Sequence, residues 1–148
     1  MHGMRAEGLS SMWNRCDFDW QSYLDLAVEI AGAVAVRPGA AEGALSQADQ
    51  ARLRCAVSRA YYAAFHKALA YQQARMPFSE SAEPVHAAVR DRFKNSANRT
   101  LWTIGNNLGL LLADRRKADY DDYIDNLAFM AEKALERANR VVTDISGL

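Results

Sequence analysis

Apolar side chains recur at helical spacing along most of the chain. In the first such segment they lie three or four positions apart, at Tyr23, Leu26, Ala27, Ile30, Ala33 and Val34. This spacing places them on one face of an amphipathic helix. An Arg-Pro-Gly sequence at 37–39 then interrupts the pattern, because proline and glycine disfavour helix. The pattern predicts a first helix over residues 20–36.

A second and longest helix is predicted from about Gln47 to Ala74. The small, polar segment before it contains Ser46 and Asp49 at the spacing of an acidic variant of the capping box. The segment "RMPFSESAEP" after it has two prolines and no periodicity, which predicts a loop. Pro84 can open a short third helix that contains Val85, His86, Val89 and Phe93.

The C-terminal part of the chain contains two further apolar stripes. The first consists of Leu101, Ile104, Leu108, Leu111 and Leu112, and the second of Tyr123, Leu127, Met130, Ala131, Ala134 and Leu135. A polar junction at about 114–119 separates them, with Asp119 placed to cap the last helix. We see no alternating strand pattern and no repeat. We therefore predict an all-α fold, a bundle of four main helices with one short additional helix. The bundle should occupy residues 19–148 and follow a flexible segment at 1–18.

Composition is typical of one compact domain. A chain of 148 residues can bury a core without disulfides or metals, and its 18 basic residues balance 18 acidic ones, which argues against a strongly basic nucleic-acid binder. Cys16 and Cys55 match no CxxC spacing and are interpreted as reduced thiols. No stretch approaches the roughly 20 apolar residues of a membrane span, and the N-terminus lacks the apolar core of a signal peptide. We expect a cytoplasmic protein without membrane contact.

Candidate chemistry lies first in "CAVSRAYYAAFHKALAY", residues 55–71. Arg59, Tyr62 and His66 share one helix face, because seven residues bring the chain almost back to the same angle. An arginine and a histidine on one phosphate suit a metal-independent ribonuclease, in which histidine takes a proton from the ribose 2′-hydroxyl and arginine stabilises charge on phosphorus. The competing interpretation is structural: the aromatic residues pack, Arg59 pairs with an internal carboxylate and His66 makes ordinary hydrogen bonds.

A second candidate is the polar junction "ADRRKADYDDYIDN". Here Arg115 and Arg116 are followed by Asp119, Tyr120 and Tyr123. Arginines beside tyrosines suit a phosphate, or a nucleobase stacked on an aromatic ring. A basic helix end next to a capped helix start explains the same residues equally well.

Metal and cofactor signatures are missing from the sequence. His2, His66 and His86 share no ligand spacing, and the aspartates near the last helix are explained as caps. The chain has no Walker loop, no GxGxxG and no GxSxG motif. We therefore expect neither a metal nor a cofactor.

Taken together, "AVSRAYYAAFHKAL" and, later in the chain, "LLADRRKADYDD" resemble the HEPN superfamily, in particular its small stand-alone members with an "SRAYYAxFH" helix and an "RxxADY" junction. The segment "EPVHAAVRDRF" resembles the "H…F" segment of the same branch, and the resemblance spans roughly Tyr23 to Arg140. It implies an antiparallel four-helix bundle that usually dimerises and is often encoded beside a minimal nucleotidyltransferase. Many members are metal-independent endoribonuclease toxins.

The family's catalytic pattern is an arginine followed closely by a histidine at the start of the final long helix. Here the junction holds Tyr120 where the histidine is expected, while His66 follows Arg59 at a comparable spacing on another helix. The site is then either assembled from Arg59, His66, Arg116 and Tyr120 across the bundle, or catalysis has been lost. A tyrosine with a pKa near 10 is a poor general base, which favours His66.

Two functional hypotheses follow, with a structural helical adaptor as a third. In the first, the chain is a dimeric HEPN-type toxin or defence protein that cleaves RNA and is regulated by a nucleotidyltransferase-like antitoxin. Its predicted catalytic residues are Arg59, His66 and Arg116, and its predicted substrate- or partner-binding residues are Tyr62, Arg115, Asp119, Tyr120 and Tyr123. In the second, it is a non-catalytic subunit that binds nucleotide or the nucleotidyltransferase through Arg115, Arg116 and Tyr120.

Overall fold

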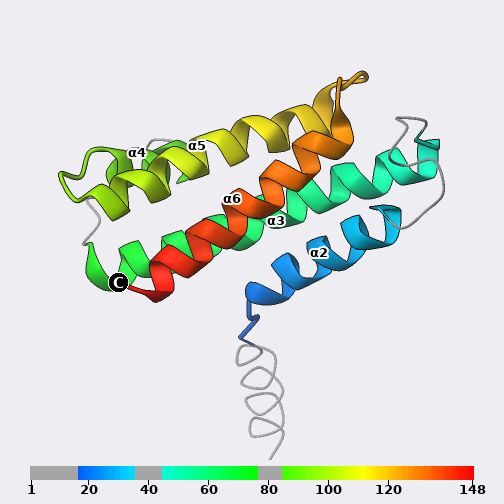
Figure 1. Cartoon of the computed structure of the whole chain (residues 1–148). Coiled ribbons are helices and arrows are strands. Elements are labelled where there is room, and N and C mark those ends of the chain that lie inside the picture. The colour runs from blue at the N-terminus through cyan, green and yellow to red at the C-terminus, as the bar shows by residue number, and fades with distance from the viewer. Residues whose placement is uncertain (1–16, 36–44, 77–84) are drawn as a thin grey trace, which may run out of the picture.

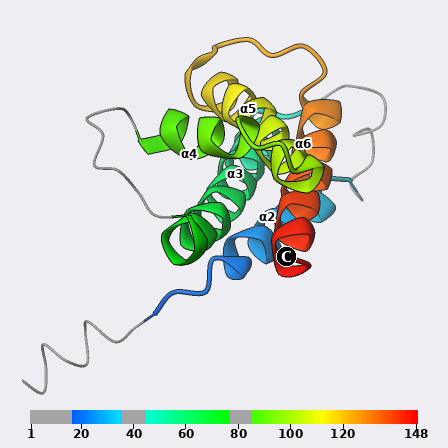
Figure 2. The same cartoon turned by 90° about the vertical axis from the view of Figure 1, so that its left-hand side faces the viewer.

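The computed structural model describes residues 17–35, 45–76 and 85–148, and the regular structure within these ranges is entirely helical. In chain order the helices are α2 (Gln21–Ala35), α3 (Gln47–Arg75), α4 (Val85–Lys94), α5 (Arg99–Tyr120) and α6 (Leu127–Ser146). The four longer helices form an antiparallel bundle, and the short α4 packs mainly on α5 (Figures 1 and 2). The predicted all-α bundle with one short additional helix is confirmed.

Helix α3 is the central element of the bundle and contacts all the others (Figure 2). Alanine is the commonest residue at its buried positions, and these alanines are Ala56, Ala60, Ala63, Ala64 and Ala68. Small side chains allow neighbouring helices to approach closely, because the distance between helix axes depends on the residues at the contact. Tyr61 and Phe65 supply the bulk on the face of α3 that contacts α4, where both rings lie near His86.

The predicted starts of the first two helices agree closely with the structure. Ser46 is the N-cap of α3, and its hydroxyl accepts a hydrogen bond of 3.1 Å from the backbone N–H of Asp49, as the capping-box spacing predicts. On α2 the buried face is rotated from the predicted one. Leu24 is buried, whereas Leu26 is 40% exposed, because α2 packs mainly on α3 and its contact face is centred nearer Leu24 and Ala27.

The junction between the last two helices lies later than predicted. Helix α5 continues through 114–119 to Tyr120, and α6 begins only at Leu127, after Asn126 in a left-handed conformation with φ of 54°. Asp119 is therefore not the cap of the last helix. Its carboxylate instead accepts a hydrogen bond from Arg115, one turn earlier on α5, at 3.3 Å.

Arg54 of α3 explains why α5 extends so far. Its guanidinium donates hydrogen bonds to the backbone carbonyls of Ala118, Asp121 and Asp122. The last carbonyls of a helix have no partner within the helix, so an arginine from a neighbouring helix can satisfy them. The end of α5 is thus fixed by a residue far away in the sequence.

Both predicted C-terminal stripes contribute to the core. Ile104, Leu108, Leu111 and Leu112 are buried on α5, and Leu127, Ala131 and Ala134 are buried on α6. Tyr123, predicted within the second stripe, precedes α6 and is 79% exposed. Gly105 lies where α4 crosses α5: a Cβ atom there would come within 2.6 Å of the backbone nitrogen of Lys94. A glycine at this position therefore allows α4 to pack closely on α5.

Several predictions concern residues outside the described ranges. These are nearly all of the flexible segment 1–18, with His2 and Cys16, the breaker at 37–39, and Pro84. Cys55 is a free, half-buried thiol. Among the described helices, none has the length and apolar character needed to cross a membrane.

Candidate functional site

Six polar and aromatic side chains from three helices come together on one side of α3, and we call them the histidine cluster. The members are Tyr61, Tyr62 and His66 of α3, His86 of α4, and Arg115 of α5, together with Arg116 of α5, which is near enough for its charge to act on His86. The sequence-predicted Tyr62, His66, Arg115 and Arg116 are thus in one neighbourhood. The helical repeat places Tyr62 and His66 one turn apart, and the packing of α4 and α5 on α3 adds the rest.

His66 carries a neutral imidazole that is stacked on an indole ring. Its ring is stacked on Trp20, with centroids 3.5 Å apart and planes 8° from parallel. Stacking covers the face of the ring, whereas the nitrogen lone pair and N–H lie in its plane, and among the described residues neither nitrogen has a hydrogen-bond partner. Burial, and then the charge of His86, lowers the pKa of His66 below its ordinary value. A neutral histidine of this kind can act as a base.

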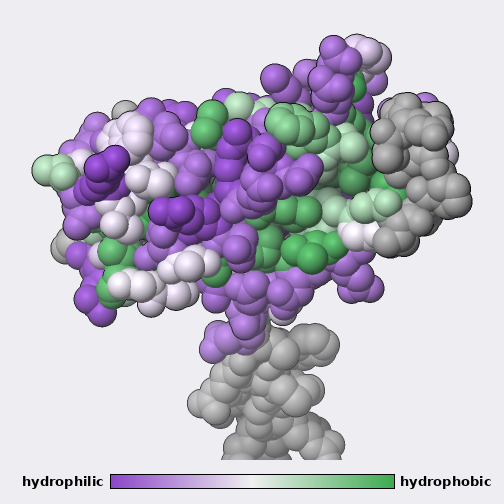
Figure 3. Space-filling view, viewed as in Figure 1, coloured by the Kyte–Doolittle hydropathy of each residue, from purple (hydrophilic) through white to green (hydrophobic). Residues whose placement is uncertain are grey.

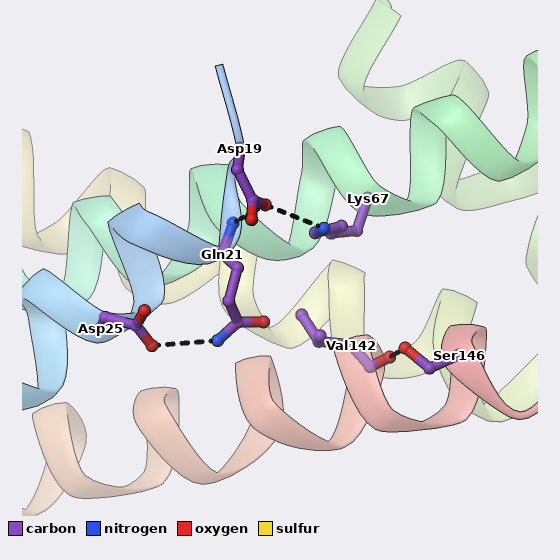
Figure 4. Close-up of polar contacts among 6 residues, drawn as sticks. All are labelled: Asp19, Gln21, Asp25, Lys67, Val142 and Ser146. Carbon is purple, nitrogen blue, oxygen red and sulfur yellow. Dashed lines mark hydrogen bonds and ion pairs between the residues drawn. The ribbon is translucent and has the colours of Figure 1, made fainter. Parts of the chain in front are cut away.

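The position of Trp20 over His66 is fixed by the residue before it. Asp19 accepts a hydrogen bond of 3.0 Å from the backbone N–H of Gln21 at the start of α2, and a second of 3.1 Å from the ammonium of Lys67 on α3 (Figure 4). These two donors, the backbone N–H first, lower the pKa of Asp19. Asp19 therefore ties the start of α2 to the turn of α3 that carries His66.

His86 joins the cluster through a short contact with Tyr61. The phenolic oxygen lies 2.6 Å from Nδ1 of His86, and the imidazole also packs on Phe65 with centroids 4.5 Å apart. Burial, followed by the charges of Arg115 and Arg116, lowers the pKa of His86. Tyr61 is 1% exposed and burial raises its pKa, so its hydroxyl stays protonated; it donates to Nδ1 or accepts from it according to the tautomer of His86.

Arg115 occupies the inner side of the cluster. Its guanidinium lies over the rings of Tyr61 and Tyr62, 5.7 Å from each centroid, and its side chain is 14% exposed. Asp119 neutralises part of the charge of Arg115. The Nε atom of Arg115 is buried and has no hydrogen-bond partner among the described residues. The aromatic faces compensate in part for this missing bond. Arg116, the next residue, is exposed, so the cluster presents one buried and one accessible cation.

Arg59 does not join this group of cations. It lies over the ring of Tyr23 on α2, with its Cζ 5.1 Å from the centroid, and makes no ion pair among the described residues. The internal carboxylate expected for Arg59 in the structural interpretation is therefore not found there. Tyr23 packs edge-on against Trp20 at 5.1 Å, so Arg59 is connected to His66 through two aromatic rings.

Tyr120 and Tyr123 lie apart from the histidine cluster, near the end of α5. Their side chains are 75% and 79% exposed, and the hydroxyl of Tyr123 donates to Asp125 at 3.3 Å. Tyr120 follows Arg116 by one helical turn, and both are exposed. We call the pair Arg116 and Tyr120 the α5 end surface, since it is available to a partner rather than enclosed in a site.

An apolar groove between α2 and α6 was not predicted from the sequence. Figure 3 shows hydrophobic side chains on this face, between the two helices. The groove is lined by Ala31, Val34, Ala35, Leu45, Leu53, Ala128, Phe129, Ala131 and Glu132. Phe129 is 60% exposed at its edge. The one signal in the sequence is a phenylalanine on the outer side of the final apolar stripe, which is weak because single exposed apolar residues are common.

His86 was also missing from the predicted site. Its contact with Tyr61 joins residues that are 25 positions apart on two different helices, and helical spacing does not predict contacts between helices. Within the described ranges, no group of three or more His, Cys, Asp and Glu side chains is placed to hold a metal ion. No family model, curated protein or solved structure matches the chain. Its function is therefore inferred from the histidine cluster itself.

Proposed function

We propose that the protein is a metal-independent endoribonuclease of the HEPN type, a toxin or defence protein regulated by a nucleotidyltransferase-like partner. The observation that carries this proposal is His66, a neutral histidine whose ring nitrogens have no hydrogen-bond partner among the described residues, in one cluster with Arg115 and Arg116. Cleavage of RNA without a metal requires a base to activate the ribose 2′-hydroxyl and cations to stabilise charge on the phosphate. The cluster contains both.

Each member of the cluster has a proposed role. His66 takes the proton of the 2′-hydroxyl, and the 2′-oxygen attacks phosphorus. Arg116, which is exposed, contacts the phosphate oxygens. The more buried Arg115, whose guanidinium lies over the Tyr62 ring, adds positive charge near the phosphate. Arg59 lies on the α2 side, so we assign it to the support of Tyr23 and Trp20 around His66 rather than to the phosphate.

The test is cleavage of total RNA and of tRNA by purified protein in EDTA. Loss of a general base typically costs about 10²–10⁴-fold in rate, so His66→Ala should lose cleavage by that factor. Arg116→Ala should also lose most of the rate. Arg140→Ala is the matched control, because this arginine is exposed on α6 and, within the described part of the chain, pairs with Asp144. Absence of cleavage by the wild-type protein would overturn the proposal.

We also propose that the protein works in the cytoplasm as a homodimer. The apolar groove between α2 and α6 supports the homodimer. A second copy that covers the groove and the exposed Phe129 removes apolar surface from water, which stabilises the dimer. Phe129→Asp should shift the protein to monomer in sedimentation experiments. Phe18→Asp, at an exposed ring outside the groove, is the control. A dimer unaffected by Phe129→Asp would contradict this interface.

A second candidate function is favoured by the α5 end surface. An exposed arginine and an exposed tyrosine one turn apart suit a partner protein or a nucleotide, so the chain can alternatively be a non-catalytic subunit that binds the nucleotidyltransferase. Arg116→Glu should then abolish a complex with a nucleotidyltransferase encoded beside it, and Arg140→Glu should not. Unchanged association of Arg116→Glu would exclude this surface.

A further inference from the structure

The proposed reaction leaves one proton transfer unassigned. When the 2′-oxygen attacks phosphorus, the bond to the 5′-oxygen breaks, and an alkoxide is a poor leaving group unless a proton reaches it. His66 takes a proton in the same step and so cannot supply one. The cluster contains a second imidazole, His86, which comes from another helix and was not among the predicted site residues.

The surroundings of His86 determine which of its nitrogens can meet a substrate. Nδ1 is occupied by the hydroxyl of Tyr61 at 2.6 Å, which leaves Nε2 as the available nitrogen. A phenolic hydroxyl can donate or accept a hydrogen bond. The Tyr61 contact therefore persists whether His86 is neutral or protonated. Phe65, with its ring 4.5 Å away, and Tyr62, at 6.2 Å, restrict the imidazole from the α3 side.

The charges around His86 change when an anion binds. In the free protein, Arg115 and Arg116 of α5 disfavour a proton on His86, and a charge on His86 in turn disfavours one on His66. Tyr61 and Tyr62 face the ring from α3, and burial raises the pKa of Tyr61, so its hydroxyl stays protonated. A phosphodiester between the arginines and His86 offsets their charge and favours protonation of His86. A charge on His86 lowers the pKa of His66, which favours a state in which His86 is protonated and is the acid while His66 is neutral and is the base.

We propose that His86 is the proton donor to the leaving group in RNA cleavage by this protein. The inference rests on the proposed ribonuclease function. His66 removes the 2′-hydroxyl proton as the 2′-oxygen bonds to phosphorus. The P–O5′ bond breaks with its electron pair on the 5′-oxygen, and the proton on Nε2 of His86 passes to that oxygen. The products are a 2′,3′-cyclic phosphate and a 5′-hydroxyl, and the two histidines have exchanged protonation states.

The decisive test compares two oligonucleotides that differ in one atom at the cleaved bond. One has the natural 5′-oxygen, and the other has sulfur there, whose thiolate leaves without a proton. His86→Ala should lose about 10²–10⁴-fold in rate on the oxygen substrate and recover nearly wild-type rate on the sulfur substrate. His66→Ala should be impaired on both. Arg140→Ala, outside the cluster, should cleave both as the wild type does.

Tyr61→Phe separates the hydrogen bond from the packing of the ring. It keeps the aromatic contacts and removes only the hydroxyl that meets Nδ1. We expect a smaller loss than in His86→Ala, with a shift in the limb of the rate–pH profile that reports the acid, and partial recovery on the sulfur substrate. A purely structural role for Tyr61 would lower the rate equally on both substrates and leave the profile unchanged.

A second measurement covers the case in which His86→Ala does not fold. The imidazole of His86 in the wild-type protein is titrated by NMR with and without a 2′-deoxy oligonucleotide, which binds but cannot be cleaved. The pKa of His86 should rise on binding in the wild type, and rise less in Arg116→Ala. An unchanged pKa in the wild-type complex would overturn the inference.

The outcomes also separate this inference from the ribonuclease proposal. If the wild type cleaves both substrates but His86→Ala is equally impaired on both, His86 is not the donor while the ribonuclease function stands. If the wild type cleaves neither substrate, the ribonuclease function fails and the donor role fails with it. Selective recovery on the sulfur substrate supports both.

Discussion

The indole of Trp20 lies parallel to the imidazole of His66, with ring centroids 3.5 Å apart. Burial is the main cause of the lowered pKa of His66, and Trp20 supplies much of the cover on that face. Trp20→Ala should therefore raise the pKa of His66 towards 6.5, because the charged imidazolium becomes better hydrated. An NMR titration of the His66 ring measures the change.

Trp102→Ala is the control for this prediction. Trp102 is a half-exposed indole on α5, and no ring contact joins it to His66. Its removal should leave the pKa of His66 unchanged. A lower pKa in Trp20→Ala would mean that attraction between the indole face and the imidazolium outweighs the loss of hydration, contrary to our expectation.

A glycine on α5 determines how closely α4, and with it His86, packs on the bundle. A Cβ atom at Gly105 would lie 2.6 Å from the backbone nitrogen of Lys94 and 2.9 Å from the carbonyl oxygen of Arg90. Neither atom belongs to a flexible side chain, so α4 must shift. We expect Gly105→Ala to lower the free energy of unfolding by about 1–3 kcal/mol, as overpacking typically does. Urea denaturation measures it.

The matched control is Gly32→Ala on α2. A Cβ atom there meets nothing within 4 Å, and alanine favours helix over glycine by up to about 1 kcal/mol. Gly32→Ala should therefore stabilise the protein. Because α4 carries His86, Gly105→Ala should also disturb the Tyr61 contact and reduce RNA cleavage, whereas Gly32→Ala should not. Equal stability of the two variants would contradict the close packing of α4.

Local patterns in the sequence predicted the helices well wherever the determining residues are neighbours in the chain. The cap of α3 needs only Ser46 and Asp49, three positions apart, and it forms as predicted. The predicted end of α5 was too early, because a run of charged residues such as 114–119 is typical of a junction between helices. In the structure Arg115 pairs with Asp119 along the helix, and Arg54 of α3 satisfies the carbonyls beyond it.

In the candidate site, too, the sequence predicted neighbours on one helix but not contacts between helices. Tyr62 and His66 are one turn apart on α3, so helical spacing predicted that they lie together. Arg59 shares their face by the same rule, yet the packing of α2 places Tyr23 under its guanidinium. The contribution of His86 depends on how α4 docks on α3 and α5, which no local pattern specifies.

Arg54 is the residue that we expect to control the order of the segment between α5 and α6. Its hydrogen bonds reach carbonyl oxygens of Ala118, Asp121 and Asp122. A hydrogen bond to a charged group contributes about 1.5–3 kcal/mol. Arg54→Gln should lower the free energy of unfolding by about that much and accelerate hydrogen exchange of the amides at 121–126.

Arg52→Gln is the comparison, two residues earlier on the same helix. Arg52 is largely exposed and pairs with Asp49 one turn away, an arrangement that contributes less than about 1 kcal/mol. It should leave exchange at 121–126 unchanged. If Arg54→Gln and Arg52→Gln behaved alike, the segment would be ordered by something other than the Arg54 contacts.

The two histidines of the cluster should make the protein less stable as the pH falls below neutrality. The pKa of His66 and that of His86 are both lowered in the folded state, whereas an unfolded chain has the ordinary value of 6.5. Above about pH 7.5 both are neutral in either state, and their burial is tolerated. As the pH falls through 6.5 the unfolded chain takes up protons first, so the free energy of unfolding decreases until the folded pKa values are reached.

Thermal denaturation between pH 7.5 and 5.5 measures this effect when the wild type is compared with His66→Gln/His86→Gln. Glutamine does not titrate, so the midpoint of the double variant should fall less over that range. Asp114 has a raised pKa and acts in the opposite direction, but it is common to both proteins and cancels in the difference. A wild-type midpoint that falls no more than that of the double variant would mean that the two imidazoles are as easily protonated in the folded protein as in the unfolded chain.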